Sequence, residues 1–132
     1  MKRPVHELRR GKSHERFWIA VPGASAVALG AIGAHLLQGR LAPTMLAVWQ
    51  TAVQFQFWHA LALALTLLAL PDGQARRTAC AGFGFGMLLF CGSLYALALG
   101  APRGIGVLTP LGGLALMAGW IALGIAAVGP RS

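Results

Sequence analysis

Hydrophobic positions along this chain fall into four long stretches, which polar or Gly/Pro-bearing segments separate. Each stretch has about the 20 mainly apolar residues that a helix needs to cross the hydrocarbon core of a bilayer. The four predicted spans are residues 17–37, 50–70, 78–99 and 109–128. Because the segments between them are short, we expect consecutive helices to lie antiparallel as neighbours.

The pattern within these stretches favours helices over the strands of a membrane barrel, since no segment alternates apolar and polar residues with a period of two. The predicted fold class is all-α: an integral-membrane, up-and-down bundle of four transmembrane helices. We expect residues 1–16 to form a basic cytoplasmic tail, residues 17–128 the transmembrane domain, and residues 129–132 a short cytoplasmic C-terminus.

Composition excludes an ordinary water-soluble domain. Hydrophobic residues make up 57% of the chain and charged residues 11%, whereas soluble proteins average about 45–50% and about 25%. Half of the net charge of +8 arises in the first sixteen residues, where six Lys and Arg residues outnumber two Glu. Because no basic face is left for a folded domain, we expect no nucleic-acid partner.

The distribution of Lys and Arg predicts the orientation in the membrane, because cytoplasmic segments retain these residues. The tail carries six of them, and Arg76, Arg77 and Arg131 fall on the same predicted side. The opposite side has only Arg40 and Arg103. Both termini are therefore predicted to face the cytoplasm (N-in/C-in). The tail either lies on anionic lipid headgroups or serves as a disordered topology signal.

Small residues recur along the predicted helices, as expected where close backbone approach replaces the hydrophobic effect as the force for association. These surfaces form either the core of one copy or a seam between copies in a homo-oligomer. The candidate packing positions are Gly30, Ala34, Gly82, Gly86, Gly112, Gly113 and Gly119.

Polar side chains at membrane depth are the first places to look for function, because they are unfavourable there unless paired. One group is predicted to share a level near the outer ends of the helices, as a hydrogen-bonded cluster. It comprises His35, Gln50, Gln54, Tyr95 and Thr109. A deeper group contains His59, with Gln56 on the same face and Ser93 at its level on the third helix. The Gln50/Gln54 face lies roughly opposite.

Two interpretations of these polar residues stay open. They hold the helices in register by bonding to one another, or they line a binding or conduction path in which His59 titrates. Ligation of a metal or haem by His35 and His59 is disfavoured by a depth difference of roughly 10 Å. The predicted spans also contain no Asp or Glu to complete a hard-metal shell.

Catalytic chemistry has no recognisable set of residues in this sequence. The spans contain no carboxylate for acid–base work. Cys80 and Cys91 lie three turns apart on one predicted helix, about 16 Å by the helical rise, so they cannot bridge each other. We therefore expect no catalytic residue, no metal site and no cofactor, and we predict that the protein is not an enzyme.

Four ordered motifs resemble those of a known family. They are Gly30-Ala-Ile-Gly-Ala-His35, Gln56-Phe-Trp-His59, Phe90-Cys-Gly-Ser-Leu-Tyr95, and Thr109-Pro-Leu-Gly-Gly113 followed by Gly119-Trp120. Together they resemble the domain of unknown function family 423, small four-helix proteins of the bacterial inner membrane. The chain departs from that family at Phe55, where Tyr is expected, and in its long basic tail. The resemblance implies the architecture and the inner-membrane location. The family has no established activity, so the resemblance leaves the function open.

Two functions are compatible with these sequence features. The first is a non-enzymatic membrane protein whose polar residues hold the bundle together, as an accessory or assembly partner of a larger membrane complex. The alternative is a small oligomeric transporter or channel. Its path would be lined by His35, Gln50, Gln54, Gln56 and His59.

Overall fold

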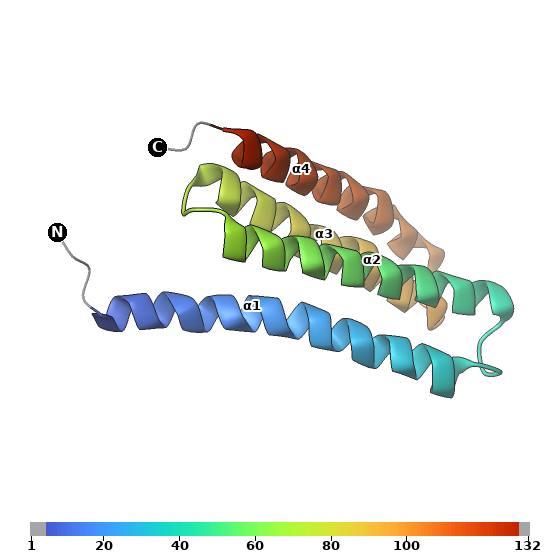
Figure 1. The fold of residues 1–132 in the computed structure, drawn as a ribbon. Coiled ribbons are helices and arrows are strands. Elements are labelled where there is room, and N and C mark those ends of the chain that lie inside the picture. The colour runs from blue at the N-terminus through green and yellow to red at the C-terminus, as the bar shows by residue number, and fades with distance from the viewer. Residues whose placement is uncertain (1–4, 130–132) are drawn as a thin grey trace.

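Four long helices run up and down in the part of the chain that the structure describes (Figure 1). The computed structural model describes residues 5–129, with side chains for residues 13–129. The helices are α1 (Val5–Ile32), α2 (Pro43–Ala69), α3 (Gln74–Ala98) and α4 (Leu108–Val128). A π-helical turn, η1 (Gly33–Leu37), follows α1, and a 3₁₀ turn, η2 (Arg103–Val107), precedes α4.

Each helix is long and apolar enough to cross a membrane. The segments that meet both conditions are Ser13–Leu37, Pro43–Ala69, Gln74–Ala98 and Arg103–Val128. The predicted four-span, all-helical fold is therefore confirmed. Both described ends of the chain lie at one end of the bundle, here called the terminal end, and the α1–α2 and α3–α4 connections lie at the far end (Figure 1).

The helices extend beyond the apolar stretches that revealed them. Helix α2 begins at Pro43, seven residues before the predicted span, because Pro is well accommodated in the first turn of a helix. Residues 5–16, which belong to the predicted basic tail, form the start of α1. Helix α1 also continues through Pro22 without a break. The length of an apolar stretch therefore does not mark where a helix begins or ends.

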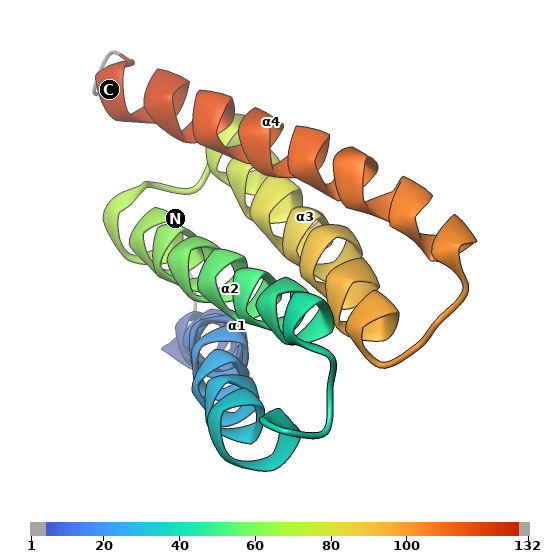
Figure 2. The same cartoon turned by 90° about the vertical axis from the view of Figure 1, so that its right-hand side faces the viewer.

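The bundle is an open, sequential arrangement. Each helix packs mainly against its neighbour in the chain, and the α3–α4 contact is the most extensive. Seen end-on, α1 and α4 lie on opposite sides of the α2–α3 pair (Figure 2). Helix α1 therefore depends largely on α2 for its packing. A groove separates α1 from α3, and α2 forms the bottom of this groove.

Glycines allow α3 and α4 to approach closely. A Cβ atom on Gly82 would lie 2.8 Å from the backbone of Ala115 and Gly119, and one on Gly119 would lie 2.9 Å from the Phe83 ring. Such distances are shorter than van der Waals contact, so only Gly fits at these positions. Phe83 is fully buried at this crossing, and Gly86 and Gly112 face the partner helix in the same way.

The remaining predicted packing positions have looser surroundings. A Cβ on Gly113 would lie 3.8 Å from the Phe90 ring, which is ordinary contact. On α1, a Cβ on Gly30 would lie 3.3 Å from Val53 of α2. Ala34 lies on the π-helical turn and is exposed. Among the predicted packing positions, the tight glycine contacts therefore belong to the α3–α4 pair.

Candidate functional site

Gln56 of α2 joins three helices through one buried side chain. Its Nε2 donates hydrogen bonds to Ser25 Oγ at 2.7 Å and to the Pro22 carbonyl oxygen at 3.1 Å, both on α1. Its Oε1 accepts a hydrogen bond from the Tyr95 hydroxyl of α3 at 2.8 Å. The side chain is only 8% exposed. We call Pro22, Ser25, Gln56 and Tyr95 the Gln56 hub.

Local sequence explains why these groups meet. Gln56 lies on a face of α2 whose other buried members include Ala52 and Ala60, and such small side chains let neighbouring backbones approach. On α1, Ser25 lies three residues after Pro22, so its hydroxyl reaches the Pro22 carbonyl oxygen one turn earlier. Here the Pro22 carbonyl accepts from both Gln56 Nε2 and Ser25 Oγ.

Trp49 forms a second link between α2 and α1, nearer the far end of the bundle. Its indole Nε1 donates to the Leu29 carbonyl oxygen at 2.9 Å, and its ring packs edge-on against Tyr95 with centroids 4.7 Å apart. A Cβ on Gly33 would lie 2.7 Å from the Trp49 ring, so the ring fits there only because residue 33 is Gly. The roles of Trp49 and Ser25 were not predicted from the sequence. The available signal was that a buried Trp usually finds an acceptor.

Ser93 and Thr109 pair across the α3–α4 interface, with their hydroxyl oxygens 2.6 Å apart. Ser93 donates its single proton to the Phe90 carbonyl oxygen at 2.9 Å. Thr109 is therefore the donor in the bond between the two hydroxyls. The pair links α4 to α3 within the first turn of α4, which begins at Leu108.

His59 lies among aromatic rings. Its Nδ1 lies 2.6 Å from the Phe55 carbonyl oxygen of its own helix. Because a carbonyl only accepts, Nδ1 carries a proton. Ring centroids of Phe55, Phe83 and Trp120 lie 5.8, 6.0 and 6.1 Å from that of His59. The imidazole is 6% exposed and packs toward α3 and α4, whereas Gln56 bonds α1 and Tyr95.

The predicted polar residues thus do not form one cluster, and they lie at several separate positions in the bundle. The structure brings Gln56 together with Tyr95, and Ser93 together with Thr109. His35, Gln50 and Gln54 are exposed, so they do not join the outer cluster that was expected to include Tyr95 and Thr109. The physical reason is helix rotation: equal depth does not make two side chains face each other.

Metal-ligating residues do not gather among the described side chains. Within residues 13–129, no three His, Cys, Asp or Glu residues lie close enough to hold a metal ion. Cys80 and Cys91 are both free thiols.

A largely apolar groove runs between α1 and α3. It consists of two adjoining cavities of about 310 and 530 Å³. Trp18, Leu63, Gly84 and Leu88 line both cavities, so the two lie side by side. The smaller cavity also reaches Gln56, Ser25 and Tyr95, and the hub therefore forms the polar part of the groove wall.

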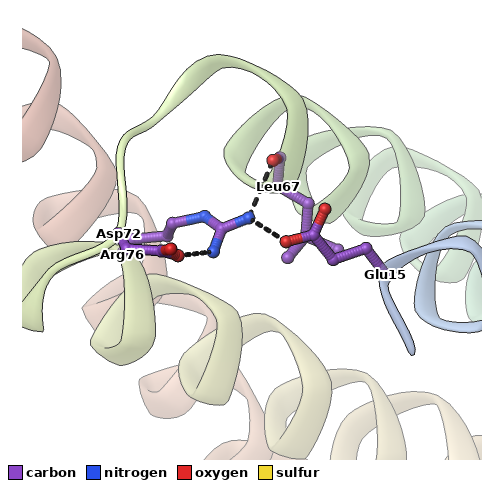
Figure 3. Close-up of polar contacts among 4 residues, drawn as sticks. All are labelled: Glu15, Leu67, Asp72 and Arg76. Carbon is purple, nitrogen blue, oxygen red and sulfur yellow. Dashed lines mark hydrogen bonds and ion pairs between the residues drawn. The ribbon is translucent and has the colours of Figure 1, made fainter. Parts of the chain in front are cut away.

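Arg76 closes the bundle at the terminal end (Figure 3). Its Nη2 donates to Glu15 Oε1 of α1 at 2.8 Å and to the Leu67 carbonyl oxygen of α2 at 2.9 Å, and its Nη1 pairs with Asp72. The side chain is 14% exposed. From the sequence, Arg76 was predicted only to mark the topology. A stronger signal was available, because the chain has only three acidic residues and two of them pair with this arginine.

The chain is similar to known proteins of one family. The family described as a protein of unknown function (DUF423) matches residues 29–113. A membrane protein of Bacillus subtilis, YwdK, is 41% identical over 83% of this chain and 91% of its own length. A membrane protein of Haemophilus influenzae is 42% identical over 80% of this chain and 86% of its own.

The inner membrane protein YgdD of Escherichia coli is 35% identical over 83% of this chain and 85% of its own length. No solved structure matches the chain. The identities and the shared length agree with the four motifs and the four membrane-spanning helices described above. The chain therefore belongs to the DUF423 family of small membrane proteins, whose function is unknown.

Proposed function

We propose that this protein is a non-catalytic accessory protein of the bacterial inner membrane, which assembles with a larger membrane protein complex. The observation that carries the proposal is the Gln56 hub, in which one buried amide joins α1, α2 and α3. Groups that are mutually bonded across helices fix the shape of a bundle, and they are not free to exchange partners with a passing substrate.

The other interior polar groups support the same function. Ser93 and Thr109 bond to each other, and Thr66 donates to the Ala62 carbonyl of its own helix. His59 bonds to its own helix within an aromatic shell. A bundle with extensive apolar surface on α1 and α4 fits a protein that acts by contact inside the membrane.

A small oligomeric transporter or channel is the second candidate. The cavity of about 310 Å³ beside Gln56, Ser25 and Tyr95 favours it. However, three of the five residues of the expected path, His35, Gln50 and Gln54, are exposed on the outside of a single copy. A path along them therefore requires several copies, with these side chains turned toward a shared axis.

Flux measurements on purified protein in proteoliposomes separate the two candidates. The accessory function predicts no movement of protons, potassium ions or small amines above that of protein-free vesicles. Protein-dependent flux that is lost in a folded His59→Ala variant would overturn the proposal, because His59 would then do more than pack. Circular dichroism of the same preparations verifies that the variant is folded.

Photo-crosslinking in native membranes tests the accessory role directly. A photoreactive residue replaces Val27 on α1 or Ile121 on α4, both of which are more than 60% exposed. We expect one defined heterologous membrane protein in the adducts from at least one of these faces. If both positions yield adducts only with lipid, the accessory function is wrong.

A further inference from the structure

One face of α2 is exposed along the whole helix, and its residues repeat with alternating spacings of three and four. We call this set the exposed stripe of α2: Ala47, Gln50, Gln54, Phe57, Leu61, Ala64 and Leu68. All are exposed except Ala64, which is half-buried. The stripe lies opposite the buried face that carries Gln56 and Leu63. No other helix in the described chain covers it.

Two members of the stripe are amides that would face hydrocarbon in a single copy. Gln54 lies eleven residues after Pro43, or about 16 Å along the axis of α2. Helix α2 is about 40 Å long, so a hydrocarbon core of about 30 Å centred on it begins about 5 Å from its end. Gln54 therefore lies well inside the core, and Gln50 lies one turn closer to the surface.

Neither amide takes part in the hydrogen bonds of the bundle. Within residues 13–129, the α2 side chains that form hydrogen bonds are Trp49, Thr51, Gln56, His59 and Thr66. An amide without a partner in an apolar solvent is strongly unfavourable. Two such amides one turn apart therefore need partners from outside this chain.

The spacing of the stripe indicates what that partner is. Positions that alternate by three and four form the seam of a left-handed helix pair, and a polar residue at such a position sets the register of the two helices. Two copies of one membrane protein share the same orientation, so a two-fold axis along the membrane normal places identical positions of α2 opposite each other. A glutamine amide has both donors and an acceptor and is thus complementary to itself.

We propose that the exposed stripe of α2 is the interface of a homodimer, in which Gln50 and Gln54 hydrogen-bond to Gln50 and Gln54 of a second copy. Phe57, Leu61 and Leu68 pack along the same seam toward the terminal end. The proposal is independent of the accessory function, since it concerns a face that the Gln56 hub does not use.

Energy transfer between labelled copies in lipid vesicles, measured over a range of protein-to-lipid ratios, tests the proposal. The Gln50→Leu/Gln54→Leu double variant is expected to weaken the dimer about 5- to 10-fold, because interhelical hydrogen bonds in membranes contribute a factor of about three each. Gln38→Leu is the matched control, since Gln38 is an exposed glutamine outside the stripe. It should leave dimerisation unchanged.

Disulfide crosslinking locates the interface. In a background of Cys80→Ala and Cys91→Ala, oxidation should join two copies through Leu61→Cys and should not join them through Leu114→Cys on α4, which is equally exposed. A monomer at every protein-to-lipid ratio overturns the proposal. So does a dimer that the double variant leaves intact, or a stripe that crosslinks only to a different protein.

Discussion

Gln56 links α2 to both α1 and α3 through one buried amide. Its amide makes hydrogen bonds of 2.7, 2.8 and 3.1 Å to groups on two other helices. Within membranes such bonds contribute about 0.6 kcal/mol each on average, because the unfolded chain also finds partners. Their combined effect is therefore moderate in energy.

Replacing Gln56 by Leu should lower the free energy of unfolding by about 2 kcal/mol, since three hydrogen bonds are lost and the Tyr95 hydroxyl is left without its acceptor. Unfolding in mixed detergent micelles, followed by circular dichroism, measures the change. Gln38→Leu is the control and should change stability little. A Gln56→Leu variant as stable as the wild type would show that the hub is energetically unimportant.

Two glycines on one helix, Gly82 and Gly84, are expected to respond in opposite ways to the same substitution. A Cβ on Gly82 meets the α4 backbone at 2.8 Å, whereas one on Gly84 meets no atom within 4 Å. Gly82→Ala should therefore destabilise the fold by about 1–3 kcal/mol through overpacking. Gly84→Ala should be neutral or stabilise by up to about 1 kcal/mol, because Ala favours helix.

The same unfolding measurement compares these two variants with the wild type. Equal effects of the two substitutions would contradict the close α3–α4 crossing. The pair also controls for helix propensity, since both positions lie within α3 and undergo an identical chemical change.

At the scale of elements, α1 is held differently from the other helices. It packs mainly against α2 and reaches α3 through side chains: Tyr95 by way of Gln56, and Arg76 by way of Glu15. These links lie toward opposite ends of the α1–α3 groove. Helix α1 is therefore attached at a few points, whereas α3 and α4 are joined along a continuous surface.

Removing the charge of Arg76 should loosen the terminal end of α1. Arg76→Gln loses the pairs with Glu15 and Asp72, and hydrogen bonds to charged groups contribute about 1.5–3 kcal/mol. Hydrogen exchange should become faster in residues 13–20 of α1 and stay unchanged in α4. The adjacent Arg77→Gln variant is the control, because Arg77 is exposed. Equal protection of the α1 amides from hydrogen exchange in both variants would exclude a role for the contacts that Arg76 makes with Glu15 and Asp72.

For the whole molecule, both described ends of the chain lie at one end of the bundle, and that end also carries Arg76 and Arg77 (Figure 1). The excess of Lys and Arg at this end predicts that it faces the cytoplasm. The far end carries only Arg40 and Arg103.

Topology reporters test this orientation. Alkaline phosphatase fused after Ser132 should be inactive, and the same enzyme fused after Arg40 should be active, because it folds only outside the cytoplasm. A fluorescent protein fused after Ser132 should be bright and provides the complementary control. Phosphatase activity at the C-terminus would reverse the predicted orientation.

The sequence alone determined that the chain has membrane-spanning helices, how many there are, and that consecutive helices alternate in direction. These follow from the length of apolar runs and the shortness of the connections, which are local properties. The positions of Gly82 and Gly86 as close contacts were also accessible, since small residues four apart are a local pattern. By contrast, nothing local distinguishes Gly84, which faces the groove.

Only the tertiary structure decided which polar residues meet. Gln54 and Gln56 are two residues apart and chemically identical, yet one is exposed and the other is the centre of the hub. Side chains two residues apart on a helix point in directions that differ by about 200°. Which direction points inward depends on how α1 and α3 pack against α2, and a sum of many contacts among distant segments decides that packing.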